Sequence, residues 1–128
     1  MSHLVFSAEW AEAFAAELQS SETYKTAAAT WEGSLLLKAG SRGVFLDLWH
    51  GSCRAARAAT AQDEATADFL LQGEDEVWRK VLHGELEPLF AIMSGKLQLR
   101  RGSLVRLTPY INAARELVKA ATRVDTSF

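Results

Sequence analysis

The first thirty residues carry apolar side chains at helical spacing. Ser7 is a suitable N-cap, and the pattern that follows it predicts a helix up to about Gln19. Its apolar stripe consists of Trp10, Phe14 and Leu18 with the alanines between them. Acidic residues occupy the other face, so we expect this helix to pack on the protein's own core and not on an anionic membrane. A second, alanine-rich helix is expected over 22–30.

From Trp31 the pattern changes to alternation, which is typical of half-buried strands. Odd positions over 31–38 are apolar or small, whereas most even positions are polar. A glycine-containing turn leads to a second alternating segment over 44–50, and the two predict a hairpin. Weaker alternation predicts strands over 53–59 and 66–72, separated by a polar turn at 62–64.

Helical spacing returns over 74–83, where acidic residues fill the first turn and basic residues the last. A second short helix begins at Pro88 and ends before Gly95. Alternation over 96–100 predicts a fifth strand, and Thr108-Pro109 has the pattern of a cap and first turn for a closing helix.

This order of elements predicts an α+β fold. We expect a five-stranded, mostly antiparallel sheet covered by helices, with N-terminal helices, two short helices before the last strand, and a C-terminal helix. The chain has 128 residues, of which 48% are hydrophobic. That content suits one core, so residues 1–128 are predicted to form a single domain.

Composition and charge exclude several classes of protein. Fourteen basic against sixteen acidic residues give a net charge of −2, without the basic excess of a nucleic-acid binder. The single cysteine cannot close an internal disulfide, and the chain begins without a signal-peptide pattern. No stretch is long and apolar enough for a membrane span. We therefore expect a cytoplasmic protein without integral membrane contact.

Charge is unevenly distributed towards the C-terminus. Residues 74–95 hold five acidic and two basic residues, whereas residues 96–128 hold seven basic and two acidic residues. The basic segment could contact an acidic head group or an anionic membrane, but we expect it mainly to pair with the acidic helical segment before it.

Candidate catalytic groups are few. His3, His50 and His83 lie far apart, without the spacing of metal ligands. Asp47, His50 and Cys53 are close in sequence, but Asp47 and His50 would point to opposite faces of a strand. The prediction is therefore a protein that is not an enzyme and that needs no metal or cofactor.

The ordered pattern from Trp31 to about Gly102 resembles the sterol carrier protein 2-like (sterol transfer) family. The resemblance is carried by Trp31-Glu-Gly33, Phe45-Leu-Asp-Leu48 with Gly51, Ala67-Asp-Phe69, Trp78 with Val81 and Gly84, Pro88, and Met93-Ser-Gly-Lys-Leu-Gln-Leu99. Such a resemblance implies helices over a sheet with an apolar tunnel between them, and non-covalent binding of sterols, fatty acids, acyl-CoA or phospholipids. By position, it implies a tunnel lined by Phe69, Leu71, Trp78, Val81, Leu82, Leu89, Phe90, Met93, Leu97, Leu99 and Ile111.

Two further classes compete with lipid binding or transfer. The same apolar residues could form a protein-interaction or structural module, filled by a partner or by a second copy in a homodimer. A small cone-shaped hydratase or isomerase has a similar length, but that fold ends on curved strands and needs an acid-base pair. Transient membrane contact is compatible with the lipid-binding hypothesis.

Overall fold

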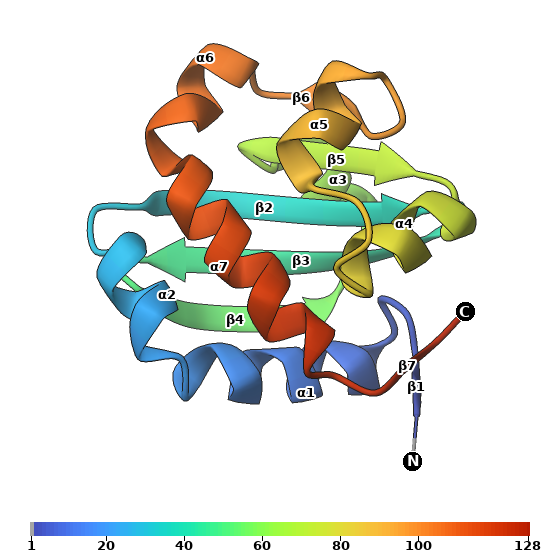
Figure 1. The fold of residues 1–128 in the computed structure, drawn as a ribbon, viewed down its shortest axis with the longest axis horizontal. Helices are drawn as coiled ribbons and strands as arrows, with labels where there is room; N and C mark the ends of the chain where they lie inside the picture. Colours follow the sequence, from blue (N-terminus) through green and yellow to red (C-terminus); the bar gives the residue numbers. More distant parts are fainter. Residues whose placement is uncertain (1) are drawn as a thin grey trace.

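The computed structural model describes residues 2–128, and its main sheet has the strand order β4-β3-β2-β5-β6 (Figure 1). The strands are β2 (Glu32–Ala39), β3 (Arg42–Trp49), β4 (Ser52–Ala58), β5 (Phe69–Gly73) and β6 (Gln98–Arg101). Only the central pair β2 and β5 is parallel among the pairings of this sheet in the described residues, and its other neighbours are antiparallel. The predicted α+β class and the five-stranded, mostly antiparallel sheet are confirmed.

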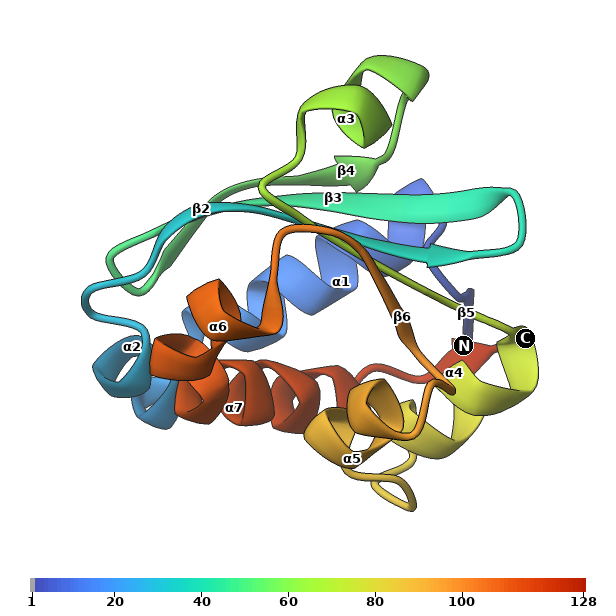
Figure 2. The same cartoon turned by 90° about the horizontal axis from the view of Figure 1, so that it is seen from above.

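Helices cover the two faces of the sheet unequally, as Figure 2 shows. The covered face carries α1 (Ala8–Gln19), α2 (Glu22–Ala27), α4 (Asp75–Leu82), α5 (Pro88–Met93), α6 (Leu104–Leu107), the 3-10 turn η1 (Thr108–Tyr110) and α7 (Ile111–Thr122). Of the helices in the described residues, only α3 (Ala61–Thr66) lies on the opposite face. The N-terminal helices, the two short helices before the last strand and the C-terminal helix are therefore where the sequence predicts them.

The two ends of the chain lie side by side (Figure 1). The short strands β1 (His3–Leu4) and β7 (Thr126–Ser127) pair in parallel, a feature that the sequence pattern does not predict. The indole N–H of Trp10 in α1 also donates to the Thr126 hydroxyl at 2.9 Å. These contacts attach the last residues to the first helix.

The segment after β4 forms a helix where the sequence analysis predicts a polar turn. Thr60 and Asp63 form a capping box, in which the Thr60 hydroxyl accepts from the Asp63 N–H and the Asp63 carboxylate accepts from the Thr60 N–H. The resulting helix α3 runs to Thr66, so β5 begins at Phe69 and not at residue 66. The prediction missed the helix because its cap residues are also common in turns.

The start of the closing helix also differs from the prediction. Ser103 caps the short helix α6, which the sequence analysis missed, by accepting from the Arg106 N–H at 3.2 Å. Thr108 and Pro109 then lie in η1, and α7 begins at Ile111. Pro109 thus occupies a tight turn before the helix and not the first position of the helix itself.

The core between the sheet and its helices is filled differently on its two sides. Beneath β4, Trp10 of α1 stacks on Phe14 with ring centroids 5.0 Å apart, and Phe6, just before α1, meets the Trp10 ring edge to face at 5.2 Å. Beneath β2 and β5, two of the covering helices, α4 and α5, are shorter than α1, and the wall is mainly aliphatic. The open space described below lies on this second side.

The α3 cap generates a prediction about acid stability. Burial by itself raises the pKa of the Asp63 carboxyl, but hydrogen bonds from the Thr60 N–H and from Arg57 outweigh burial, so the pKa lies below its usual value. Asp63 therefore stabilises the fold above the unfolded-state pKa of about 3.9 and loses this contribution as the pH falls through the lower folded-state value.

We expect Asp63→Asn to lower the free energy of unfolding at pH 7. The difference from the unsubstituted protein should shrink as the pH falls below about 4, measured by urea unfolding at a series of pH values. Glu12→Gln, at an exposed position of α1, is the control and should show no such convergence. A deficit of Asp63→Asn that stays constant down to pH 2 would contradict the assigned role.

Candidate functional site

An apolar cavity lies between β2 and β5 of the sheet and the helices α4, α5 and α7. Its volume is about 40 Å³, which is room for a few water-sized groups. The wall is formed by Trp31, Leu35, Leu37, Leu71, Trp78, Val81, Leu82, Glu87, Pro88, Leu89, Ile92, Leu97, Leu107, Ile111, Ala114, Arg115, Leu117, Val118 and Ala121. All but two of these side chains are uncharged, so the cavity can hold an apolar group and offers little to a strongly hydrated one.

The sheet provides the floor of the cavity through the pleat of its central strands. Leu35 and Leu37 lie on the same face of β2, and Leu71 of β5 is the registered neighbour of Leu37. Leu36, between them, faces the other side and packs with Ala67 and Leu70. The period of two in the sequence thus places alternate leucines in the cavity wall.

The helices provide the remaining walls through their inward faces. Val81 and Leu82 of α4 are buried, and Trp78 is held in position because its indole N–H donates to the Lys38 carbonyl at 2.8 Å. From α7, Ile111, Leu117 and Val118 join the wall. Leu107 of α6 extends it beside Ile111.

The two charged wall residues pair with each other at the rim. Nε of Arg115 in α7 lies 3.1 Å from Oε1 of Glu87, and both side chains are nearly half exposed. Glu87 is also the N-cap of α5 and accepts from the Phe90 N–H at 2.9 Å. Burial opposes ionisation of Glu87, but these hydrogen bonds outweigh it and hold the pKa of Glu87 below its usual value. The ion pair therefore links α5 to α7 across the edge of the cavity.

The eleven residues implied by the resemblance divide into two groups in the structure. Seven line the cavity, namely Leu71, Trp78, Val81, Leu82, Leu89, Leu97 and Ile111. Phe69 is buried in the core, with Arg106 over its ring, and Leu99 is half-buried, but neither belongs to the cavity wall. Phe90 and Met93 lie at the surface, 58% and 71% exposed.

The position of Phe90 and Met93 follows from the helical period of α5. Leu89 and Ile92 are three residues apart and share the inward face. Phe90 and Met93 share a neighbouring face, which turns to solvent. The resemblance assigns Leu89, Phe90 and Met93 to the tunnel by position, and spacing alone cannot orient a six-residue helix that is apolar at every position.

Sequence reasoning also misses part of the wall. The pattern places Leu35 and Leu37 on one face of a strand, and Leu117 on an apolar helix face, but no local pattern assigns them to an open space. Trp31 opens the predicted strand and shares the predicted face of Leu35 and Leu37, but it is not among the residues predicted to line a tunnel. The positions of Leu35 and Leu37 could have been predicted, because residues on the inner face of a central strand face the layer between the sheet and its helices.

The predicted pairing of the basic C-terminal segment with the acidic segment holds for Arg115, through Glu87. Arg123 instead pairs with Glu17 of α1 at 3.0 Å, and Lys119 with Glu116 of its own helix at 3.2 Å. The basic residues are thus distributed over several acidic partners.

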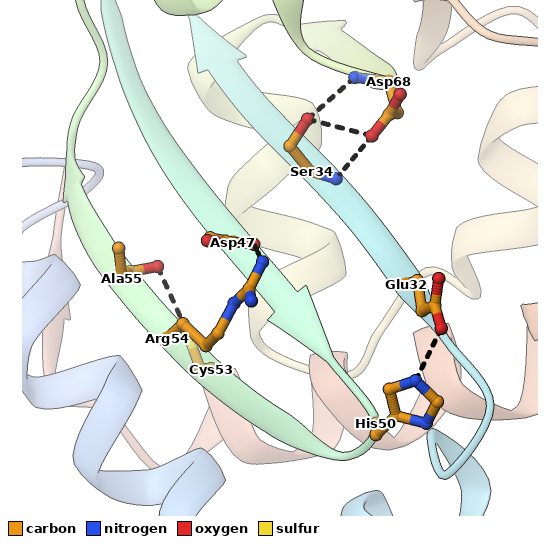
Figure 3. A network of polar contacts seen from close by, with 8 residues as sticks. All are labelled: Glu32, Ser34, Asp47, His50, Cys53, Arg54, Ala55 and Asp68. Atoms are coloured by element: carbon orange, nitrogen blue, oxygen red, sulfur yellow. Dashed lines mark hydrogen bonds and ion pairs between the residues drawn. The ribbon is translucent and has the colours of Figure 1, made fainter.

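Asp47, His50 and Cys53 do not form a catalytic group, as Figure 3 shows. Asp47 pairs with Arg54 at 3.1 Å, and the ring nitrogens of His50 contact the Ala29 carbonyl and the Glu32 carboxylate. Burial raises the pKa of the Cys53 thiol to about 11. At neutral pH this thiol is therefore protonated, whereas a nucleophilic cysteine acts as the thiolate.

Metal-binding clusters and membrane-spanning helices are both absent from the described residues. Within residues 2–128, no three histidine, cysteine or acidic side chains are grouped so that they could hold a metal ion. None of the helices in the described part of the chain has the length and apolar character needed to cross a membrane.

Comparison with solved structures finds close similarity over almost the whole chain. A crystal structure of sterol carrier protein 2 is 45% identical and covers 94% of this chain and 98% of that chain, with a TM-score of 0.87. A solution structure of a protein from Thermus thermophilus, described as possibly a sterol carrier protein, is 42% identical and covers 99% of this chain and 94% of that chain, with a TM-score of 0.84.

A more distant structure shares the fold. The sterol carrier protein 2 of Aedes aegypti, solved in complex with the C16 fatty acid palmitate, is 18% identical and covers 82% of this chain and 93% of that chain, with a TM-score of 0.50. Comparison with curated proteins finds no match. The model of the SCP-2 sterol transfer family matches residues 12–101. With most of the sequence matched by that model and two close structural relatives, this chain belongs to the SCP-2 sterol transfer family.

Proposed function

We propose that this protein is a non-catalytic lipid-binding protein, in which residues 1–128 form one domain that holds the apolar part of a lipid. The observation that carries the proposal is the cavity between β2 and the helices α4, α5 and α7, whose wall is almost wholly apolar. Membership of the SCP-2 sterol transfer family supports it, as does the palmitate complex of the Aedes aegypti protein. The ligand classes are fatty acids, acyl-CoA, sterols and phospholipids.

The physical basis of binding is transfer of methylene groups from water to this wall. Each buried methylene contributes about 0.8 kcal/mol, so an acyl chain binds with few polar contacts. The cavity of about 40 Å³ is smaller than such a chain, so binding requires the wall to move outwards. The sheet residues of the wall are buried and α7 is anchored by four buried residues, whereas α5 has only one, Ala91. We therefore propose that α5 is the part of the wall that moves outwards.

We expect Ala114→Leu to weaken lipid binding about ten-fold, because the larger side chain occupies space for about two methylene groups. The measurement is saturable fluorescence of cis-parinaric acid, a polyene fatty acid, with thermal unfolding to confirm that the variant is folded. Ala65→Leu makes the same change at an exposed position of α3, outside the cavity, and should bind as the unsubstituted protein does. Equal affinities of both variants would argue against binding in this cavity.

Transfer of a lipid also requires contact with a membrane, and the outer face of α5 is suited to it. Phe90 and Met93 are exposed there, while Leu89 and Ile92 of the same helix line the cavity. If the Phe90 and Met93 side chains insert into a bilayer, the bilayer contacts α5, which is the helix whose movement we propose. We therefore propose transient contact with a lipid bilayer through Phe90 and Met93.

We expect the double substitution Phe90→Ser and Met93→Ser to slow lipid transfer between phosphatidylcholine vesicles several-fold while leaving equilibrium binding of cis-parinaric acid unchanged. The reason is that both side chains lie outside the cavity wall. Val105→Ser, at an exposed position of α6, is the matched control. Light scattering after size exclusion distinguishes the alternative, since a homodimer that dissociates on the double substitution would assign this face to a second copy.

A further inference from the structure

Trp31, a residue of the cavity wall, has an indole N–H without a hydrogen-bond partner among the described residues, which suggests what polar group a ligand carries. We propose that the indole N–H of Trp31 donates a hydrogen bond to the bound lipid, and that the accepting group is neutral, a hydroxyl or carbonyl oxygen. This inference rests on the proposed function and extends it from an apolar chain in general to the polar end of that chain.

The Trp31 side chain is only 1% exposed and forms part of the cavity wall. Its Nε1 atom is buried and finds no hydrogen-bond acceptor among residues 2–128. A buried donor without a partner destabilises a fold, so nearly all such groups in proteins are paired with protein or water. An acceptor supplied by a ligand in the cavity would remove this cost.

The ring of Trp31 is also fixed in position. It stacks on Tyr110 of η1, with ring centroids 5.3 Å apart and planes only 6° from parallel. The backbone is held on both sides, because the Trp31 N–H donates to the Ala28 carbonyl at 3.0 Å and the His50 N–H donates to the Trp31 carbonyl at 2.8 Å. The stacking therefore holds the plane of the indole ring, and the backbone hydrogen bonds hold the residue that carries it.

The indole N–H groups of two other buried tryptophans are hydrogen-bonded within the protein. The N–H of Trp10 donates to the Thr126 hydroxyl at 2.9 Å, and that of Trp78 donates to the Lys38 carbonyl at 2.8 Å. Trp78 lines the same cavity as Trp31, so proximity to the cavity does not by itself leave an indole unpaired. Tyr24 has the other buried side-chain polar atom without a partner in residues 2–128, but Tyr24 is not part of the wall.

The surroundings of Trp31 favour a neutral acceptor over a carboxylate. Apolar side chains, including Leu35 and Ile111, share the wall with it, and one N–H cannot replace the water shell of an ion. The cationic group of the wall, Arg115, lies at the half-exposed rim and is paired with Glu87. An ionised head group would therefore stay at the rim, in contact with water, and only an uncharged oxygen would reach Trp31.

The test compares three ligands of one chain length, dodecan-1-ol, dodecane and dodecanoate at pH 8, by displacement of cis-parinaric acid. Trp31→Phe keeps an aromatic ring at this position and removes the N–H. We expect it to weaken binding of dodecan-1-ol about three- to ten-fold more than binding of dodecane or dodecanoate, the range for loss of one hydrogen bond, because the change in ring size acts on all three ligands. Trp78→Phe is the matched control, because it removes an indole N–H that is already bonded to the Lys38 carbonyl. It should not weaken the binding of dodecan-1-ol more than that of the other two ligands.

Each outcome separates this inference from the proposed function. If none of the three ligands binds the unsubstituted protein, the proposed function fails. If they bind and Trp31→Phe affects all three equally, the hydrogen bond is absent and lipid binding stands. Weakening of dodecanoate as large as that of dodecan-1-ol would overturn the preference for a neutral oxygen.

A measurement on the unsubstituted protein keeps the inference testable if Trp31→Phe does not fold. In ¹⁵N-¹H correlation spectra, the indole N–H signal of Trp31 should move downfield on addition of dodecan-1-ol but not of dodecane, since only the alcohol carries an acceptor. The signal is assigned with selectively labelled tryptophan and the Trp10→Phe, Trp49→Phe and Trp78→Phe variants. An unmoved Trp31 signal with saturating dodecan-1-ol would overturn the proposal.

Discussion

The structure depends on the burial of the central strand β2 on both faces and both edges. Strand β2 is hydrogen-bonded to β3 on one side and, in parallel, to β5 on the other. A parallel neighbour cannot be reached by a tight hairpin, so the chain must cross over, and it does so through α3 on the otherwise open face. There the crossover segment covers Leu36, while Leu35 and Leu37 face the helices. The same strand is thus the centre of the core and the floor of the cavity.

Helices α4 and α5, which line the cavity, are shorter than α1. Beneath β3 and β4, the twelve-residue α1 brings Trp10 and Phe14 against the sheet, and the large rings fill the layer. Beneath β2 and β5, the eight residues of α4 and the six of α5 present mainly leucine, isoleucine and valine, and α7 crosses above them. The layer under α1 is thus closely packed, whereas the layer under β2 and β5 keeps an unfilled space. The Glu87–Arg115 pair joins α5 to α7 at the rim, where water can solvate both charges.

The sequence was sufficient to predict features with a strong local period. The hairpin of β2 and β3, the cap at Ser7, the helix start at Pro88, and the weakly alternating β4 all follow from residue spacing. It was insufficient where local signals are ambiguous, as at Thr60, whose capping box also has the composition of a turn. It was also insufficient where an outcome depends on distant contacts, as for Met93, which lies outside the cavity because the neighbouring face of α5 docks inward. Facing directions in short helices are set by packing, which a single sequence does not contain.

Some of the residues that carry the family resemblance hold the sheet together and lie outside the cavity wall. Gly33 and Asp68, from two separate motifs, meet at the start of the β2–β5 pair, as Figure 3 shows for Asp68 and the adjacent Ser34. The Asp68 carboxylate accepts from the Ser34 N–H at 2.9 Å, and the Ser34 hydroxyl accepts from the Asp68 N–H at 2.9 Å. A side chain at Gly33, whose φ is +149°, would place its Cβ 3.0 Å from the Asp68 carboxylate. These motif residues set the register of the parallel pair and do not line the cavity. Other motif residues, among them Trp31 and Leu97, line the cavity, and the ligand selectivity that follows from the proposed function would depend on such wall residues.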